Sequence, residues 1–497
     1  MVLSYNCVLY SKRGNQPMEE GKSRTKVTKQ IPTLIETQSV ASFSNQQFVL
    51  SSTHKFLSVT NVLAKDNSCN SLKHLMASFL RKKREDIRTA RKIGELRRPP
   101  AEDFSNDAFS IKIARGLQWH VTFAPDESRL AWIASPQKVI LVPWDSQNNC
   151  LATSCYSPEG SSGAVKKPNE KLAITIECGY PVVSVAFGKG KPKNSLLDSK
   201  ASYWTRFDSS KLIILATGHT NGRIRVWDGE TGRLLLELMD HAEAVRDLAF
   251  APDGSLRLIS ASLDGKLKGW DLNDDGNMFK TFVYHKGPVV SISWSPTSKL
   301  LASASYDKTV GIWNMTTYKL INKLVGHFNN VSCCCFSPDG AVLATSSWDT
   351  QVILWDPYTG TRLRTLYHMY PVPNLIYASG LNNAWVRAVS YSFDGMSIVT
   401  TSDDNLIRFW NLMGDEDPEG IAAEAEGTLC CTYSPSGRSV AVGTELFRLK
   451  FFATQPQVPP LMHLARMAVR KIVDTKDVDK LWIPRSLKLY LTYRSWN

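Results

Sequence analysis

Tryptophan recurs at an almost constant interval through the middle of this 497-residue chain. Three successive spacings are 43, 43 and 42 residues, and the last spacing, which ends on a phenylalanine, is 42 residues again. Each Trp closes an apolar stretch and is followed by Asp or Asn. A repeat of about 40–45 residues indicates a unit that its neighbours cover on both faces, so the chain is predicted to be all-β and built of four-stranded blades. The repeat positions are Trp144, Trp227, Trp270, Trp313, Trp355, Trp410 and Phe452.

These repeats predict a WD40 β-propeller over residues 116–453. The interval from Trp144 to Trp227 is twice the usual length, but 146–170 and 189–209 are poor in strand character. We therefore expect one blade with two loops there and seven blades in total, with eight as the alternative. A further loop is expected at about 368–384 in the long interval before Trp410.

A second pattern inside the repeats tests this assignment. A hydroxyl residue stands ten positions before five of the Trp residues, at Thr217, Ser260, Ser303, Thr345 and Thr400, and Asn or Asp stands six before, at Asn221, Asp264, Asp307, Asp349 and Asp404. Three blades also have a His 28 or 29 positions before the Trp. This resembles the WD40 structural tetrad, a closed chain of hydrogen bonds that satisfies buried polar groups. The expected tetrads are His241, Ser260, Asp264 and Trp270; His285, Ser303, Asp307 and Trp313; and His327, Thr345, Asp349 and Trp355.

Charge and cysteine use narrow the class of protein. The net positive charge of residues 1–100 and 459–497 together exceeds the +13 of the whole chain. The stretch between them is therefore mildly acidic, which argues against a nucleic-acid-binding surface there. The ten cysteines form no C-x-x-C pair or zinc spacing, which favours free thiols in a reducing compartment, the cytoplasm or the nucleus. No apolar run is long enough for a membrane span, and the first residues lack the pattern of a secretory signal.

The same sequence argues against an enzyme. The expected tetrads already account for His241, His285 and His327, so no metal site or catalytic residue is predicted. No phosphate-binding Gly-rich loop, nucleophile elbow or H-E-x-x-H motif is found, and no cofactor is expected.

The last 39 residues, 459–497, form a separate segment after a tether at 454–458. Pro459 and Pro460 stand where a helix begins, and Arg470 and Lys471 lie near its end, where cations are favoured. Between them the apolar residues recur at helical spacing and predict one apolar face that must be covered by the chain itself or by a partner. This face consists of Leu461, Leu464, Ala465, Ala468, Val469 and Ile472.

The terminal segment resembles the SOCS box. The matches are Leu461, His463, Leu464, Arg466 and Arg470, and later Leu481, Ile483, Pro484, Leu487 and Leu491. Ala465 replaces the usual cysteine, and Trp482 replaces the first proline of the second motif, where it removes a fixed φ and adds a bulky ring. The resemblance implies a helix that fits a groove on elongin C through Leu461, His463, Leu464, Ala465, Arg466, Ala468, Val469 and Ile472, and a cullin contact through Leu481, Trp482, Ile483 and Pro484.

The first 115 residues precede the expected propeller. Residues 1–75 are polar and without periodicity, and we expect them to be disordered. Residues 76–115 form a basic segment leading into the propeller, and its start resembles the start of the WD repeat and SOCS box-containing proteins, so Met76 is an alternative start of translation. The basic run from Arg81 to Arg98 is interpreted as a solvated helix face whose Leu80, Ile87 and Leu96 dock on the propeller, with a nuclear import signal or an acidic-partner contact as alternatives.

Over 76–497 the chain thus resembles the WD repeat and SOCS box-containing family. This implies a non-catalytic substrate receptor of a ubiquitin ligase, with elongin B and elongin C, a cullin-5 type scaffold with its RING protein, and a target protein held by the propeller. Leu461 would be the main anchor on elongin C. Two alternatives stay open: a scaffold whose terminal helix packs on its own propeller and recruits no ligase, and an enzyme with a site in the central channel. The target, the cullin preference and the oligomeric state do not follow from the sequence.

Overall fold

The computed structural model describes residues 88–89, 92–96, 120–145, 150–151, 173–190, 213–368, 385–414, 417–423, 427–454 and 459–495. All of them belong to one compact unit, residues 68–497. The segment 1–75, the alternative start at Met76 and the loop 368–384 beyond His368 lie outside the described residues, so the expectations for them stay predictions.

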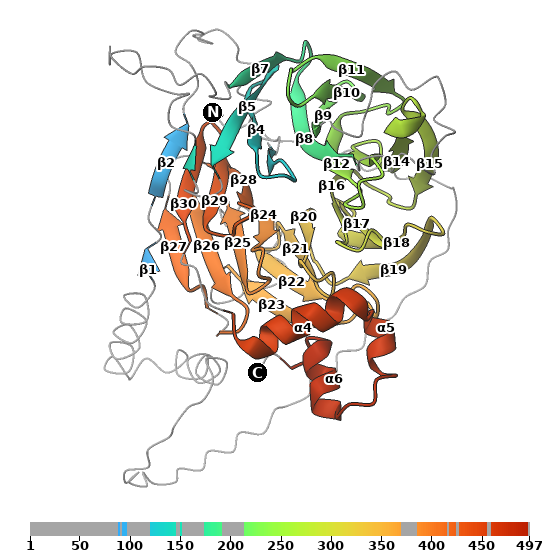
Figure 1. The fold of residues 1–497 in the computed structure, drawn as a ribbon, viewed down its shortest axis with the longest axis vertical. Coiled ribbons are helices and arrows are strands. Elements are labelled where there is room, and N and C mark those ends of the chain that lie inside the picture. Colours follow the sequence, from blue (N-terminus) through green and yellow to red (C-terminus); the bar gives the residue numbers. More distant parts are fainter. Residues whose placement is uncertain are drawn as a thin grey trace, which may run out of the picture. The chain divides into compact units, whose positions relative to one another are not determined.

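Four-stranded sheets follow one another in a ring, and the first strands of successive sheets contact each other until the last meets the first (Figure 1). The prediction of a seven-bladed propeller is confirmed. The long interval before Trp227 holds the end of blade 1 and most of blade 2, as expected for one blade with loops. The strands of the first three blades are β3 (Val121–Phe123), β4 (Arg129–Ser135), β5 (Lys138–Asp145) and β7 (Ile174–Glu177), with β6 (Cys150–Leu151) also paired to β5; β8 (Val182–Lys189), β9 (Ile213–His219), β10 (Arg223–Asp228) and β11 (Leu234–Met239); and β12 (Val245–Phe250), β13 (Arg257–Ser262), β14 (Lys266–Asp271) and β15 (Asn277–Val283), with a short 3-10 helix η2 (Leu272–Asp274).

The next three blades repeat this pattern. Their inner strands are mostly buried, whereas the outermost strand of blade 4 alternates between exposed and more buried residues, as expected for a strand covered on one side. The strands are β16 (Val289–Trp294), β17 (Leu300–Ser305), β18 (Thr309–Asn314) and β19 (Lys319–Val325); β20 (Val331–Phe336), β21 (Leu343–Ser347), β22 (Gln351–Trp355) and β23 (Arg362–Tyr367); and β24 (Val386–Tyr391), β25 (Ser397–Ser402), β26 (Leu406–Asn411) and β27 (Gly420–Ala423).

Blade 7 is completed by residues from the start of the chain. It contains β28 (Thr428–Tyr433), β29 (Ser439–Thr444) and β30 (Leu449–Ala453), and its fourth strand is β2 (Lys92–Leu96), antiparallel to β30. The neighbouring β1 (Arg88–Thr89) pairs with β27 in parallel. The helical interpretation of the basic run is therefore wrong for these residues, and a propeller boundary at residue 116 leaves out one strand. An edge that lacked β2 would expose unpaired backbone groups of β30.

The two rims of the ring carry different connections. In an antiparallel blade, the turn between the second and third strands lies at the same end as the connections between blades. We call this end the tetrad rim. The turns between the first and second strands, and between the third and fourth, form the opposite rim. There Gly340 and Gly395 adopt φ of 69° in the turns that follow Asp339 and Asp394.

After the propeller come three helices, α4 (Leu461–Ile472), α5 (Thr475–Val478) and α6 (Arg485–Leu491), drawn in red in Figure 1. The predicted terminal helix is thus present, and it begins directly after Pro460. Val478, Tyr490, Leu491 and Tyr493 are buried among these helices and the propeller. Within the described residues, no helix has both the length and the apolar character that crossing a bilayer requires.

Candidate functional site

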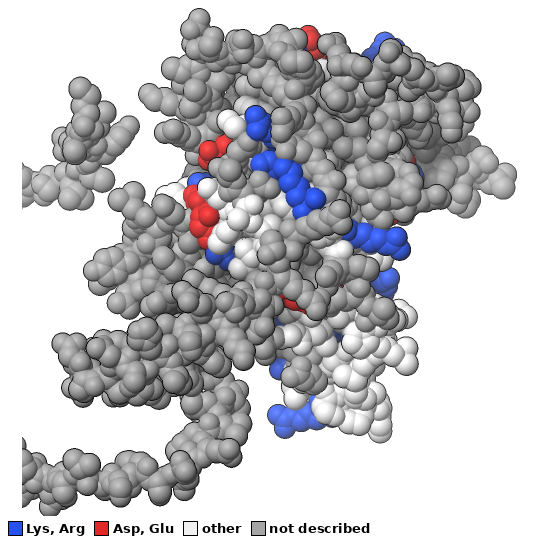
Figure 2. All heavy atoms as spheres, turned by 90° about the vertical axis from the view of Figure 1, so that its left-hand side faces the viewer, with Lys and Arg blue, Asp and Glu red and all other residues white. Residues whose placement is uncertain are grey.

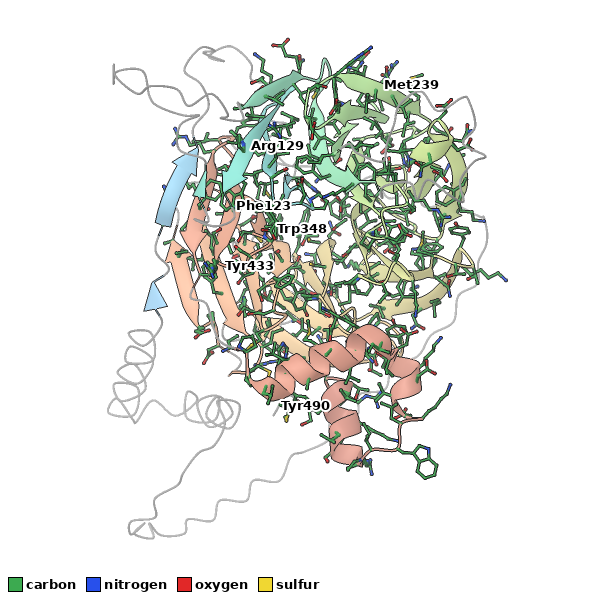
Figure 3. All side chains as sticks on the ribbon, in the orientation of Figure 1. Phe123, Arg129, Met239, Trp348, Tyr433 and Tyr490 are labelled. Carbon is green, nitrogen blue, oxygen red and sulfur yellow. The ribbon has the colours of Figure 1, made fainter. Side chains whose placement is uncertain are left out.

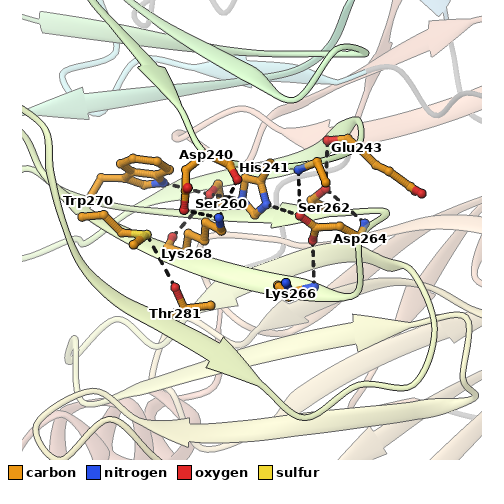
Figure 4. A network of polar contacts seen from close by, with 12 residues as sticks. Asp240, His241, Glu243, Ser260, Ser262, Asp264, Lys266, Lys268, Trp270 and Thr281 are labelled. Carbon is orange, nitrogen blue, oxygen red and sulfur yellow. Dashed lines mark hydrogen bonds and ion pairs between the residues drawn. The ribbon is translucent and has the colours of Figure 1, made fainter.

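Blade 3 shows how the polar residues of a repeat are used (Figure 4). The Nδ1 atom of His241 lies 2.8 Å from Asp264 and its Nε2 atom lies 2.7 Å from the Ser260 hydroxyl. The same hydroxyl accepts a 2.9 Å hydrogen bond from the indole N–H of Trp270. Burial lowers the pKa of His241, although Asp264 opposes this shift. The imidazole is therefore neutral at pH 7, with one nitrogen donating to the carboxylate and the other available to the hydroxyl.

Blades 4 and 5 repeat this chain of contacts, so the structure brings together all twelve predicted tetrad residues. Each imidazole bridges the carboxylate and the hydroxyl, and each Trp donates to the hydroxyl. No side chain of these sets is left over for catalysis, and no group of three His, Cys, Asp or Glu suited to a metal occurs in the described ranges. The distances are 3.0, 2.8 and 3.0 Å for His285–Asp307, His285–Ser303 and Trp313–Ser303, and 2.8 Å for His327–Asp349, His327–Thr345 and Trp355–Thr345.

Blades 2 and 6 contain histidines that the spacing rule did not find. His219 lies on the same strand as Thr217, two residues on and therefore on the same face, and its Nε2 atom is 3.0 Å from the Thr217 hydroxyl. His368 lies 2.8 Å from the Thr400 hydroxyl, although it precedes Trp410 by 42 residues because a long loop intervenes. Asp404, six residues before Trp410, pairs with Arg408 instead. A search for any His near the hydroxyl residues would have found His219, but nothing local marks His368.

Among the described residues, blades 1 and 7 lack this set. The indole N–H of Trp144 is buried without an acceptor in the described ranges, and its ring stacks on Phe451 at 5.5 Å. In blade 7, Phe452 replaces Trp, and Val442 occupies the position of the hydroxyl ten residues earlier. A phenyl ring has no donor, so an apolar neighbour is sufficient there.

Helix α4 turns its apolar face away from the propeller. Leu461 is 82% exposed, Leu464 is 48% exposed and Ile472 is 85% exposed, and Ala465 and Ala468 are also exposed. Val469 is half-buried. In Figure 2, residues other than Lys, Arg, Asp and Glu predominate on the described surface at the lower end of the molecule, where these helices lie. An exposed apolar stripe of this kind marks a binding surface.

The polar face of α4 is the buried one. The Nε2 atom of His463 lies 2.7 Å from the backbone oxygen of Asp394. Because a carbonyl oxygen can only accept, Nε2 carries the proton and donates this hydrogen bond. Its Nδ1 atom then accepts a 2.9 Å hydrogen bond from Arg466. Arg470 donates to the hydroxyl of Thr475 and to the backbone oxygen of Val473.

Arg466 is buried without a carboxylate among its described contacts. Its guanidinium lies 4.2 Å from the ring centre of Tyr490 and 3.9 Å from that of Tyr493. The hydroxyl of Tyr493 in turn donates to Asp339 at 2.6 Å. A cation between two aromatic faces is stabilised electrostatically without a counter-ion in contact.

These contacts correct the sequence interpretation at two positions. His463 and Arg466 were expected to face elongin C, but their side chains are 0% and 1% exposed and bind the propeller side of the helix. The physical reason is that they lie on the face of α4 opposite Leu461 and Leu464, and this face meets Asp394 and the two tyrosines. Sequence reasoning missed Tyr490 and Tyr493 as docking residues, since nothing in their spacing distinguishes them from ordinary core residues.

The second motif lies before α6. Pro484 is the residue at the N-terminal cap of α6, with φ of −55°. Trp482 is fully exposed, at 103% of its reference area, whereas Leu481 and Ile483 are half-buried. The four residues expected to contact a cullin therefore lie in one short segment, and Trp482 is fully exposed on it.

Comparison with known proteins identifies both parts of the chain. The family described as "WD domain, G-beta repeat" matches residues 232–271, 276–314, 318–356 and 377–411, and the SOCS box family matches residues 457–492. WD repeat and SOCS box-containing protein 1 from Homo sapiens is 44% identical over 433 residues, which cover 84% of this chain and all of that protein. Its Xenopus tropicalis counterpart is 43% identical over 82% of this chain and 97% of that protein. Nuclear distribution protein PAC1 from Arthroderma otae is 32% identical over 45% of this chain and 39% of that protein.

A WD40 propeller joined to a SOCS box defines a class of adaptors, the substrate receptors of E3 ubiquitin ligases. The chain belongs to the family of WD repeat and SOCS box-containing proteins.

Proposed function

We propose that this chain is the substrate-receptor subunit of a ubiquitin ligase of the elongin B/C and cullin-5 type. Its SOCS box recruits elongin C together with elongin B, and then a cullin-5 type scaffold with its RING protein. Its propeller holds the target protein. The chain itself supplies no catalytic residue; it brings target lysines close to the ubiquitin-bearing enzyme and so acts by proximity.

The observation that carries this proposal is the inverted burial of α4. Leu461, Leu464 and Ile472 are exposed although the helix is docked, because the docked face is built from His463, Arg466 and Arg470. A helix that served only as a cap would bury its apolar face against its own domain. The exposed stripe fits the helix-in-groove mode of recognition, with anchors one helical turn apart. The rival scaffold interpretation leaves this stripe without a role.

The test is co-purification of elongin B and C with the full-length chain carrying Leu461→Asp and Leu464→Asp. We expect elongin binding to weaken at least about 100-fold, because two central apolar contacts are replaced by charges. Met239→Asp is the matched control, since Met239 is also exposed but lies on the outer strand of blade 2 (Figure 3). Elongin binding by the double variant at the wild-type level would contradict the proposal.

The contacts that dock the SOCS box on the propeller support the proximity mechanism. Lys299 and Asp474 form a 3.0 Å ion pair, which joins the turn before β17 to the residue before α5. Together with the His463 and Tyr493 contacts, it ties the SOCS box to three neighbouring blades, 4, 5 and 6. A fixed orientation would set the distance between a bound target and the catalytic subunits.

We further propose that the protein works in the cytoplasm or the nucleus. Six cysteines with described side chains are free. Burial raises the pKa of three of them, Cys178, Cys335 and Cys430, to about 12, so these three thiols are protonated and unreactive. Microscopy of the tagged full-length chain is the direct test, and secretion would contradict the proposal.

A further inference from the structure

The SOCS box occupies only one rim of the propeller. Its described contacts go to Lys299, Asp339 and Asp394, each in a turn between the first and second strands of a blade, and to Met413, between the third and fourth strands. All four positions belong to the opposite rim. Within the described part of the chain, the tetrad rim is therefore left free for another partner.

Three aromatic side chains form a row on the tetrad rim of blades 4 to 6. Trp348 and Trp385 stack in parallel, with ring centres 4.6 Å apart and planes at 3°. Tyr306 lies 5.1 Å from Trp348. All three side chains are half-buried. Tyr306 and Trp348 each precede a tetrad Asp but take no part in the tetrad, so the blade structure does not require an aromatic residue at either position. Figure 3 shows Trp348 toward the middle of the ring.

A salt-bridged arginine stiffens this row. The guanidinium of Arg387 lies 5.3 Å from the ring centre of Trp348 and 5.7 Å from that of Trp385. The same group donates two hydrogen bonds to Asp403, at 2.5 and 2.7 Å. The planar bidentate pair holds the cation in place and satisfies the carboxylate. Asp403 is thus not available to balance other positive charge on the rim.

Two further donors near this row have no acceptor. Arg246 is 3% exposed and hydrogen-bonds the Tyr306 hydroxyl, but its Nε–H has no partner among the described residues. The indole N–H of Trp385 likewise has none. Buried donors are normally paired. Both of these groups can only donate, so they favour a partner that offers acceptor oxygen atoms at this row.

The charge at the edge of the row has the same sign. Lys286 and Lys308 are exposed on the tetrad rim of blade 4, on either side of Asp307. Asp307 already accepts from His285, from the Lys286 backbone and from Thr309. Neither lysine ammonium is within ion-pair distance of a carboxylate in the residues that the structure describes. The two lysines outnumber the ionised Asp307, so the edge of the row formed by these three residues is positively charged, although the stretch of chain between 101 and 458 is mildly acidic as a whole.

We propose that these residues form the target-binding site, and that they take an acidic segment of the target protein. The site, here called the aromatic patch, consists of Arg246, Lys286, Tyr306, Lys308, Trp348 and Trp385. The Arg246 guanidinium and the two lysines attract the anionic oxygens of the segment, and a neighbouring apolar residue packs on Trp348. This inference rests on the proposed function, because only that function makes the bound partner a target of the ligase. A carboxylate and a phosphorylated side chain share this chemistry, and the experiment separates them.

The test uses the full-length chain bound to elongin B and C and a synthetic library of 12-residue peptides. One sublibrary carries Asp or Glu at the central positions, a second carries Asn or Gln there, and a third carries phosphoserine. We expect the acidic or phosphoserine peptides to be retained over the amide peptides. The retained peptides are then resynthesised with a fluorophore for binding titrations against the variants.

Lys286→Glu with Lys308→Glu is the main variant, because both side chains are exposed and the fold is not disturbed. We expect it to weaken binding of the selected peptide about tenfold. Arg246→Gln is expected to weaken it at least about 30-fold, since a buried charge-assisted contact is lost. Lys280→Glu with Lys319→Glu is the matched control, because these lysines are exposed on the outer strands of blades 3 and 4.

Each outcome decides between the possibilities. Preference for the carboxylate sublibrary or for the phosphoserine sublibrary supports the proposal and identifies the source of the anion. Retention of no peptide by the wild-type complex, equal retention of amide peptides, or an unchanged affinity of the Lys286→Glu/Lys308→Glu variant would overturn it. Elongin binding is measured in the same samples. Loss of elongin with intact peptide selection would contradict only the proposed function. Intact elongin binding with loss of peptide selection would contradict only this inference.

Discussion

The propeller blades and helix α4 bury polar groups in opposite settings. In blades 3 to 5, His, Asp and a hydroxyl lie between apolar strands, and each polar group has a partner within the same blade. In α4, the polar side chains His463 and Arg466 are buried at a contact between two parts of the chain, while Leu461 and Leu464 are exposed. Burial of a polar set therefore serves the fold in both places, whereas the apolar face of α4 is left uncovered by the described residues.

Removing a tetrad carboxylate should give the largest effect on stability. Asp349 accepts from the His327 ring and from the backbone N–H groups of Phe328 and Gln351. Asp349→Ala leaves three donors unpaired, two of them buried, so we expect the free energy of unfolding to fall by about 3 kcal/mol. Urea unfolding measures this, with the exposed Asp274→Ala as control. A loss below about 1 kcal/mol would mean that the blade does not depend on its tetrad.

Arg466→Ala should break the docking of the SOCS box while leaving its binding face intact. The variant loses two cation–π contacts and the donor to His463, and we expect the docked state to lose about 2–3 kcal/mol. Hydrogen exchange of α4 is the measurement, with the exposed Arg485→Ala as control. Elongin binding should stay within about twofold of wild type, because Leu461 and Leu464 are unchanged. Unchanged exchange would show that the polar face is not what holds the helix.

The buried histidine of blade 2 should make the propeller sensitive to acid. Burial lowers the pKa of His219 to about 4 in the folded protein, from 6.5. The unfolded chain therefore binds more protons between these values, and the stability that is fully present above pH 6.5 is lost as the pH falls toward 4. We expect this residue to account for about 2 kcal/mol between pH 7 and pH 5. Comparing the pH dependence of urea unfolding for wild type and His219→Gln isolates it, and parallel curves would contradict the assignment.

Trp482→Ala should give the smallest effect on stability. The side chain is fully exposed, so the free energy of unfolding should change by less than about 0.5 kcal/mol. If the proposed cullin contact is right, assembly of the elongin-bound chain with a cullin-5 type scaffold should still weaken, because exposed Trp residues often dominate interfaces. Size-exclusion assembly assays measure this, with Leu446→Ala in blade 7 as an exposed apolar control. Unchanged assembly would place the cullin contact elsewhere.

The propeller could be predicted almost completely because its signals are local. The Trp spacing determines the blade length, and ten residues from hydroxyl to Trp span one hairpin, so the register that joins them follows from the turn. The strand β2 was missed because it joins residue 92 to residue 452, far apart in the chain. His368 was missed for a related reason, since a loop of variable length separates it from its partner Thr400.

For the SOCS box, the sequence defined a helix with one apolar face and one polar face, together with the short motif at 481–484. It did not determine which face meets the propeller. Apolar character alone would bury Leu461 and expose Arg466, because an unpaired buried charge is normally unfavourable. The tertiary structure reverses this by placing Tyr490 and Tyr493 against the Arg466 guanidinium and the Asp394 backbone oxygen against His463, so that both buried polar side chains have partners. The repeat and the helix are thus properties of the sequence, and the direction in which the helix faces is a property of the packed protein.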